Sequence, residues 1–305
     1  MIYPPKNNNL ILLNNVEINT VAHYINWTYF FKAWKVAGKY DGIEKLCLCD
    51  ACESAWLQKI DANQREKARE ALQLFRDAQR LLAEIAAGKS FSIKAVFQIL
   101  QAKSENEGII FFSGNQPVYI PMLRQQQKNE GGHFLSLSDF VSPHKDFVGV
   151  FATSVAGSDE LCKKSENDSY KALLTQTLAD RLAEATTEWL HEQIRKTYWG
   201  YAPNENLTVD ELFKCKYQGI RPAVGYPALP DQSVIFLLDK ILNFSQTGIK
   251  ITENGSMYPT ASICGLMFAH PQASYFVIGK IGDDQFFDYI SRRGFSAEEA
   301  KKWLI

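Results

Sequence analysis

Apolar residues at three- and four-residue steps predict two long helices in this chain. One apolar stripe runs through residues 61–87, and Gly88 follows it as a C-cap. A second stripe extends from about Tyr170 to Tyr198. Asp180, Arg181, Glu184 and Glu188 occupy much of the remaining surface of that helix. A shorter stripe predicts a buried helix that Gly38 closes, and its members are Trp27, Phe30, Phe31 and Trp34.

Short apolar runs between turn residues predict strands in the middle of the chain. Residues 109–112 and 118–120 flank Ser113-Gly114-Asn115-Gln116, which predicts a hairpin. Residues 147–152 form another apolar strand. The polar run over 157–168 predicts a solvated loop.

The last third of the chain predicts a helix around residues 231–245 and strands over 261–269 and 274–281. Ser296 and Glu299 form a capping box that begins a final helix, with Ala300, Trp303 and Leu304 packing inward. Short connectors favour antiparallel pairing, and no internal repeat or linker divides the chain. The order of elements therefore predicts an α+β fold rather than alternating βαβ units.

Composition excludes several classes of partner. The chain has 305 residues, of which 46% are hydrophobic and 22% charged, with a net charge of −1. No basic field would recruit nucleic acid or an anionic membrane. The N-terminal residues lack the pattern of a signal peptide, and no apolar run approaches the ~18 residues of a membrane span. A cytoplasmic location is expected.

Three of the six cysteines lie together as Cys47, Cys49 and Cys52. This C-x-C-x-x-C pattern could supply three thiolates to zinc or to an iron–sulfur cluster. No second C-x-x-C or H-x-x-H pair follows at a zinc-finger distance. We therefore expect no metal here and favour reduced thiols in a variable loop, with the metal site as the less favoured alternative.

Sequence motifs for common catalytic sites are missing. There is no G-x-G-x-x-G after a strand, no P-loop lysine and no G-x-S-x-G elbow. His191-Glu192 begins like a zincin motif, but residue 195 is arginine and cannot be the second ligand. The residues alone indicate a ligand-binding or docking module, without a catalytic group of its own.

A loop between Tyr217 and Ala228 is the strongest candidate for ligand binding. Pro222 and Pro227 exclude a helix, and Gly225 permits close approach of the backbone. Arg221 offers a planar fork for a carboxylate, and Tyr226 offers a ring for stacking. Such a loop fits a small zwitterionic ligand with an aromatic group. A structural Pro/Gly turn with a surface arginine is the alternative, and it is the reading that the residues alone favour.

From about Val21 onward, specific motifs resemble the activation, or reactivation, domain of cobalamin-dependent methionine synthase. They are, in order, residues 24–31 (YINWTYFF), 37–40 (AGKY), 178–185 (LADRLAEA), 190–192 (LHE), 196–207 (KTYWGYAPNENL), the 217–228 loop, and the block from Met257-Tyr258-Pro259 to His270-Pro271 with Tyr275. The resemblance implies a C-shaped domain over residues 21–305, built on a twisted antiparallel sheet with flanking helices. Residues 1–20 would be an extension, and residues 41–63, which contain the cysteines, a family-atypical insertion.

The resemblance also implies a function. Such domains bind S-adenosylmethionine in a shallow groove and support repair of methionine synthase when its cobalamin is oxidised to cob(II)alamin. An electron from flavodoxin or a similar reductant and a methyl group from S-adenosylmethionine then restore methylcobalamin. This chain is expected to be a free-standing activation subunit, inactive without a cobalamin-bearing partner. The alternative is a docking module for a corrinoid protein that has lost S-adenosylmethionine binding.

Ligand-binding residues follow from the resemblance. Arg221 would hold the methionine carboxylate, the backbone from Ala223 through Gly225 to Tyr226 would bind polar groups, and the Tyr226 ring would cover the ligand near the corrin. Tyr275 and Phe276 would pack against the adenosine.

Two departures from the family pattern lie at the same expected site. Asn26 stands where the family has an aspartate that helps bind the ligand. The lost charge leaves three alternatives: weaker binding, compensation by Glu184, or a lost function. Cys215 stands where a family member can carry glutamate. Asp180 and Arg181 would face the partner that carries cobalamin.

Overall fold

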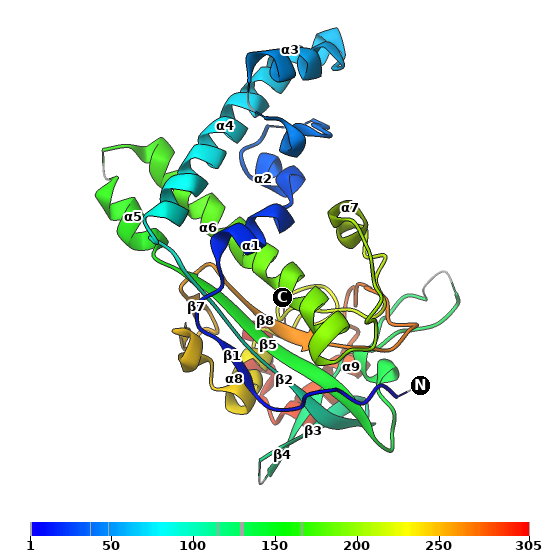
Figure 1. Cartoon of the computed structure of the whole chain (residues 1–305). Helices are drawn as coiled ribbons and strands as arrows, with labels where there is room; N and C mark the ends of the chain where they lie inside the picture. The colour runs from blue at the N-terminus through cyan, green and yellow to red at the C-terminus, as the bar shows by residue number, and fades with distance from the viewer. Residues whose placement is uncertain are drawn as a thin grey trace. The chain divides into compact units, whose positions relative to one another are not determined.

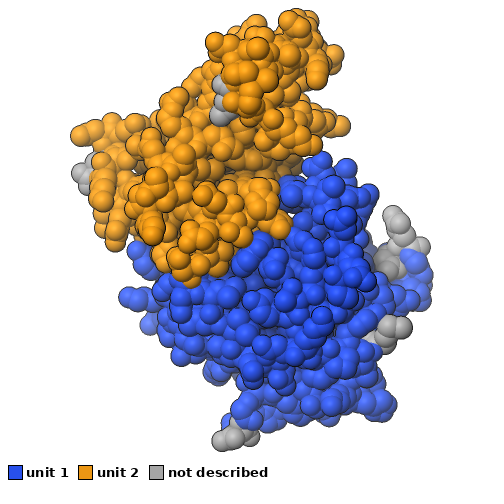
Figure 2. All heavy atoms as spheres, viewed as in Figure 1, with its two compact units in different colours: residues 1–14, 94–154, 187–305 blue, residues 15–93, 155–186 orange. Residues whose placement is uncertain are grey.

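The computed structural model describes residues 2–36, 38–47, 49–114, 116–128, 131–165 and 167–304. The chain folds into two compact units, coloured separately in Figure 2. Unit 1 comprises residues 1–14, 94–154 and 187–305, and unit 2 comprises residues 15–93 and 155–186. No helix in the described part of the chain is both long and apolar enough to cross a membrane.

An antiparallel sheet forms the centre of unit 1 (Figure 1). Its strand order is β4-β3-β2-β5-β8, and β1 also pairs with β2. The pairs β1–β2, β2–β3, β3–β4 and β5–β8 are antiparallel. The strands are β1 Ile11–Leu13, β2 Ser92–Glu105, β3 Gly108–Ser113, β4 Gln116–Pro121, β5 Asp146–Ala156 and β8 Ser262–Met267. A separate pair joins β6 Lys250–Ile251 to β7 Met257–Tyr258.

Alternation along the strands gives this sheet two buried faces. Val150 and Leu266 belong to a core cluster that includes helix α8 (Val234–Leu242). The next residue of each strand, Phe151 or Met267, packs with Leu190 near the end of α6 (Ser169–Gln193). Because successive strand side chains point to opposite faces, α8 covers one face and the end of α6 covers the other.

Further helices of unit 1 complete its surface. They are the 3-10 helices η4 Leu137–Phe140 and η6 Phe244–Thr247, the π-helical turn η5 Ile194–Tyr198, and the α-helices α7 Val209–Phe213, α9 Asp283–Arg293 and α10 Ala297–Trp303. Helix α8 confirms the helix expected around residues 231–245, with narrower bounds. In α10 the Ser296 side chain accepts a hydrogen bond from the Glu299 N–H, as the capping motif predicts.

Unit 2 is helical. Helix α4 (Arg65–Ala87) buries all the apolar stripe predicted for it, and Gly88 is its C-cap. The Phe75 ring of this helix meets Trp27 of α2 edge-on at 4.6 Å. The other elements are α1 Ile18–Val21, η1 Ala22–Tyr24, α2 Trp27–Ala33, η2 Ile43–Lys45, α3 Asp50–Gln58, η3 Ala62–Gln64, α5 Ser158–Lys164 and the first part of α6. Helix α2 ends at Ala33, before the expected Gly38.

The predicted hairpin is confirmed, because β3 and β4 pair with Ile109 opposite Ile120 and Phe111 opposite Val118. Asn115 of its expected connection lies outside the described residues.

The prediction of a solvated loop over residues 157–168 is wrong, because helix α5 (Ser158–Lys164) lies within this range. Gly157 at φ +108° precedes the helix, and a Cβ there would lie 2.1 Å from the Ser90 carbonyl oxygen. Two acidic residues occupy the first turn and two lysines the last, an arrangement that favours a helix through its dipole although few residues are apolar.

The prediction of a strand over residues 274–281 is also wrong, because these described residues form no strand and pair with none of the sheets. The segment instead hydrogen-bonds to loops: the Ile278 N–H donates to the Pro227 carbonyl at 3.0 Å, and the Gln126 N–H donates to the Ile278 carbonyl at 3.3 Å. Its apolar residues are explained by packing, because Phe276 and Ile278 join the core cluster on the α8 face.

Candidate ligand site

The loop that follows Tyr217 runs as an extended segment along strand β8. Ile220 and Phe268 exchange backbone hydrogen bonds of 3.0 and 2.9 Å, and the Val224 N–H donates to the Cys264 carbonyl at 3.0 Å. The Leu266 N–H donates to the Pro222 carbonyl at 3.0 Å. Gly265 permits this approach, since a Cβ there would lie 2.3 Å from the Pro222 oxygen. The sheet therefore fixes the backbone on both sides of Arg221.

A tight turn ends this segment. Gly225 has φ +82°, and its N–H donates to the Leu229 carbonyl at 2.9 Å. The Tyr226 N–H donates to the Ala223 carbonyl, and Tyr226 keeps 51% of its surface exposed. The turn thus places the Tyr226 ring at the surface of unit 1. The ring directly follows the backbone segment that is hydrogen-bonded to β8.

Arg221 is held by a two-fold ion pair with Glu188 of α6. Its Nη2 lies 2.6 Å from one carboxylate oxygen and its Nη1 lies 3.1 Å from the other. The Glu188 side chain is 7% exposed and the Arg221 side chain 15%. Charge-assisted bonds of this kind fix the plane of the guanidinium as well as its charge. Glu188 raises the pKa of Arg221 and thus keeps it charged against the opposing effect of burial.

Two tyrosines support Arg221. The Tyr217 hydroxyl accepts from Arg221 Nη1 at 2.9 Å, and the Tyr275 hydroxyl accepts from the Arg221 backbone N–H at 3.0 Å. The two hydroxyls lie 3.3 Å apart. Burial raises the pKa of Tyr217 well above its ordinary value, so it stays a neutral phenol.

A neutral histidine lies beside the pair. The His191 Nδ1 is 3.4 Å from Arg221 Nη1, which can only donate, so Nδ1 is the acceptor in any hydrogen bond between them. His191 is fully buried, and burial with the nearby Arg195 and Arg221 lowers its pKa well below 6.5.

A second buried ion pair lies behind Tyr217. Arg195, in the π-helical turn η5, binds Glu205 through Nε and Nη2 at 2.8 and 2.5 Å. Its guanidinium lies over the Tyr217 ring at 4.3 Å. Each arginine thus has its own carboxylate, and the group carries no net charge.

The ion pair leaves one edge of Arg221 available. A guanidinium can bind a carboxylate through its Nη1/Nη2 edge or through its Nε/Nη2 edge. Glu188 takes the first edge, with Tyr217 and His191 also on Nη1. Among the described residues none accepts a hydrogen bond from Nε. The geometry therefore suits the carboxylate of a ligand on the second edge.

Comparison with known proteins identifies the family. Residues 17–294 match the family model described as "Vitamin B12 dependent methionine synthase, activation domain". The chain belongs to this family. It is also similar to a solved structure, "Crystal Structure of the MetH Reactivation Domain bound to AdoHcy", with 34% sequence identity and a TM-score of 0.87. That match covers 99% of this chain and 91% of the other. The resemblance seen in the motifs is thus confirmed, as is the α+β fold with its antiparallel sheet and flanking helices.

Most ligand-binding residues predicted for this activation domain lie near one another in unit 1. Arg221, Ala223, Gly225 and Tyr226 share the loop along β8, and Tyr275 bonds to it. Phe276 is 9% exposed, with its ring 6.3 Å from that of Phe140 in the core. Cys215 is exposed, and its sulfur accepts from the Tyr217 hydroxyl at 3.5 Å.

The remaining predicted residues belong to unit 2. Asn26 is the N-cap of α2, where its side chain accepts from the Tyr29 N–H at 3.3 Å. Asp180 accepts from Gln176 at 3.2 Å, and burial raises the pKa of its carboxyl. Arg181 and Glu184 follow on the same helix. The ligand and partner roles of these four residues stay predictions.

Sequence reasoning missed three residues of the activation domain's arginine site. Glu188 was grouped with the polar side of α6 but is buried, and His191 and Tyr217 are buried too. Glu188, His191 and Arg195 follow one another at i, i+3 and i+7, which places them on one face of a helix. The sequence did carry one indication of this site: three ionisable residues recur at the spacing that apolar residues have on the buried face of a helix.

Proposed function

We propose that this activation domain binds S-adenosylmethionine with the methionine carboxylate on the Nε/Nη2 edge of Arg221. The observation that carries the proposal is the Glu188–Arg221 pair, which fixes a buried guanidinium with one edge still available. The related reactivation domain bound to AdoHcy supports it, since AdoHcy has the same amino-acid end.

The other contacts of the ligand are assigned by its chemistry. The backbone from Ala223 to Tyr226 offers polar groups, and the exposed Tyr226 ring offers a face for the adenosine or the corrin. The sulfonium and ammonium groups require oxygen acceptors. The roles in ligand binding that the resemblance implies for Asn26 and Glu184 of unit 2 stay predictions.

Bound S-adenosylmethionine would supply the methyl group that, with one electron from flavodoxin or a similar reductant, converts cob(II)alamin to methylcobalamin and leaves S-adenosylhomocysteine. The cobalamin would be carried by a partner chain of a split methionine synthase. The residues of this domain would bind and orient the methyl donor, and Asp180 with Arg181 would contact the partner.

Calorimetric titration with S-adenosylmethionine tests the proposal. We expect a Kd of roughly micromolar order for the native protein and weakening by about 10- to 100-fold in Arg221→Ala, the value of a charge-assisted pair. The double variant Arg221→Gln with Glu188→Gln removes both charges together, so neither is left buried without its partner. It therefore separates loss of the ligand contact from misfolding. Arg124→Ala is the matched control, because it removes an ion-paired arginine elsewhere in unit 1.

The alternative is a docking module without S-adenosylmethionine binding, which the amide Asn26 in place of an acid favours. Absence of binding heat at about millimolar ligand, well above the expected Kd, would exclude the proposal and leave the docking module as the alternative. Replacing Asp180 by Asn should weaken binding to a cobalamin-carrying protein while leaving S-adenosylmethionine binding unchanged.

A further inference from the structure

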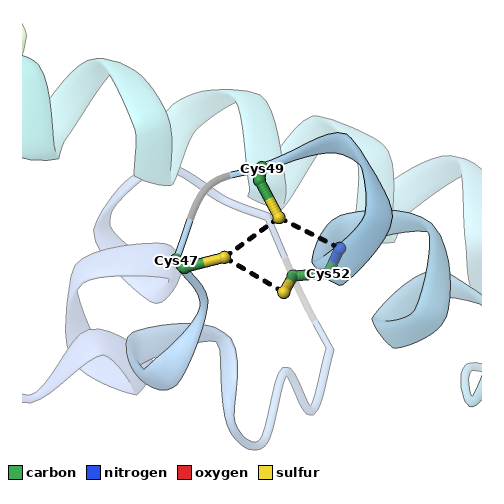
Figure 3. A group of neighbouring side chains, drawn as sticks. All are labelled: Cys47, Cys49 and Cys52. Atoms are coloured by element: carbon green, nitrogen blue, oxygen red, sulfur yellow. Dashed lines mark hydrogen bonds between the residues drawn. The ribbon is translucent and has the colours of Figure 1, made fainter.

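Three exposed cysteines converge at the start of helix α3, within unit 2 (Figure 3). The Cys47 sulfur lies 3.0 Å from the sulfurs of both Cys49 and Cys52. All three sulfurs lie within 4.8 Å of one another. The cysteines come from a six-residue segment, and in Figure 3 their side chains point toward one centre.

The spacing of the sulfurs is close to that of a thiolate metal site. Zinc–sulfur bonds of about 2.3 Å in tetrahedral geometry separate neighbouring sulfurs by about 3.8 Å. The observed separations, from 3.0 Å to at most 4.8 Å, lie on both sides of that value. Small side-chain rotations would therefore bring all three sulfurs to metal-binding distance.

The local backbone also favours a thiolate at Cys49. Cys49 is the N-cap of α3, and its sulfur accepts from the Cys52 N–H at 3.5 Å. N–H donors at a helix N-terminus stabilise negative charge on such a sulfur. All six cysteines of the chain are free, so no disulfide consumes these sulfurs.

We propose that Cys47, Cys49 and Cys52 bind one Zn²⁺ ion through three thiolates. Within the part of the chain that the structure describes, no further histidine, cysteine or carboxylate joins the group, so a water or an exogenous ligand takes the fourth position. Soft thiolates select Zn²⁺ over Mg²⁺ or Ca²⁺, which prefer oxygen ligands.

Zinc at this position would stabilise the start of α3. Two other contacts already fasten that helix: Glu53 is ion-paired with Arg76 of α4, and the Trp56 indole N–H donates to the Asp41 carbonyl at 3.0 Å. The metal would add a third contact by cross-linking Cys47 to the N-terminus of the helix. This site is separate from the S-adenosylmethionine proposal and shares no residue with it.

Metal binding to the full chain tests the inference. Protein is reduced, freed of reductant under anaerobic conditions and titrated with Co²⁺, which gives thiolate-to-cobalt charge-transfer bands when sulfur binds. We expect one Co²⁺ per chain, displaced by one Zn²⁺. Cys47→Ser, Cys49→Ser and Cys52→Ser should each weaken binding at least about tenfold, because each removes a ligand. Cys215→Ser, which removes an exposed cysteine elsewhere, should leave binding unchanged.

Two results would overturn the inference. One is the absence of charge-transfer bands in reduced protein with excess Co²⁺. The other is a titration of equal affinity in the three variants and in the native chain. Circular dichroism of each apo variant checks that the helices remain folded, so that loss of metal binding is attributable to the missing thiolate.

Discussion

Replacing Glu188 by Gln should destabilise unit 1, because it leaves the Arg221 cation without its anionic partner. Both side chains are mostly buried, and the two bonds that join them measure 2.6 and 3.1 Å. Removing one partner of a buried ion pair costs about 3–5 kcal/mol. Gln keeps one acceptor oxygen, so we expect a loss of about 1.5–3 kcal/mol, the value of a hydrogen bond to a charged group.

A double-mutant cycle measures this pair. Glu188→Gln, Arg221→Gln and the double variant are unfolded in urea, and the free energies of unfolding are compared. We expect a coupling energy of about 1.5–3 kcal/mol, because the double variant leaves no unpaired buried charge.

The matched control is the surface pair Arg124–Glu107, whose side chains are 31% and 50% exposed. A coupling of at most about 1 kcal/mol is expected there. If the Glu188–Arg221 coupling were below about 0.5 kcal/mol, the pair would not fix Arg221, and the reasoning would be refuted.

Three further predictions concern the same site. Gly225→Ala should lower stability by about 1–2 kcal/mol and weaken S-adenosylmethionine binding in calorimetry, because φ is +82° and the new Cβ would lie 2.5 Å from Gln232 Oε1; a binding constant equal to the native one would contradict this role for the turn. Tyr275→Phe removes the acceptor of the Arg221 backbone N–H and should cost about 0.5–1.5 kcal/mol in urea unfolding, an effect that an unchanged midpoint would exclude. Burial lowers the pKa of His191 in the folded state, so the unfolded chain binds more protons and stability falls as the pH drops below 6.5. His191→Gln should flatten that dependence of the free energy of unfolding below about pH 6.5, and equal slopes for both proteins would count against the assignment.

Sequence patterns correctly predicted those helices and hairpins whose structure depends on residues close together in the chain. The stripe of α4 could be read directly, since one apolar face of a long helix repeats many times in sequence. The hairpin of β3 and β4 could also be read, because its two strands flank a turn signal. Helix α5 was missed because its capping glycine and charged turns gave no apolar period.

The segment after β8 shows the limit of such patterns. Apolar residues in 274–281 resemble a strand, yet Ile278 bonds to loop carbonyls and packs into the core. Apolar residues at alternate positions indicate that one side of a segment is buried. They do not show whether a neighbouring strand is present to form backbone hydrogen bonds with it.

The candidate site was predictable only in part. Arg221, Gly225 and Tyr226 lie in one short loop with strong backbone constraints, so their association was visible. Glu188 lies 33 residues from Arg221, and only the fold brings the two together. The partner that decides which edge of the guanidinium is available therefore came from the structure.

A crystal structure of the protein with S-adenosylmethionine tests the central claim most directly. The account predicts the ligand carboxylate within hydrogen-bond distance of Arg221 Nε and Nη2, with Glu188 still on the Nη1/Nη2 edge. A ligand that leaves Arg221 without contact, or that displaces Glu188 from it, would contradict the account.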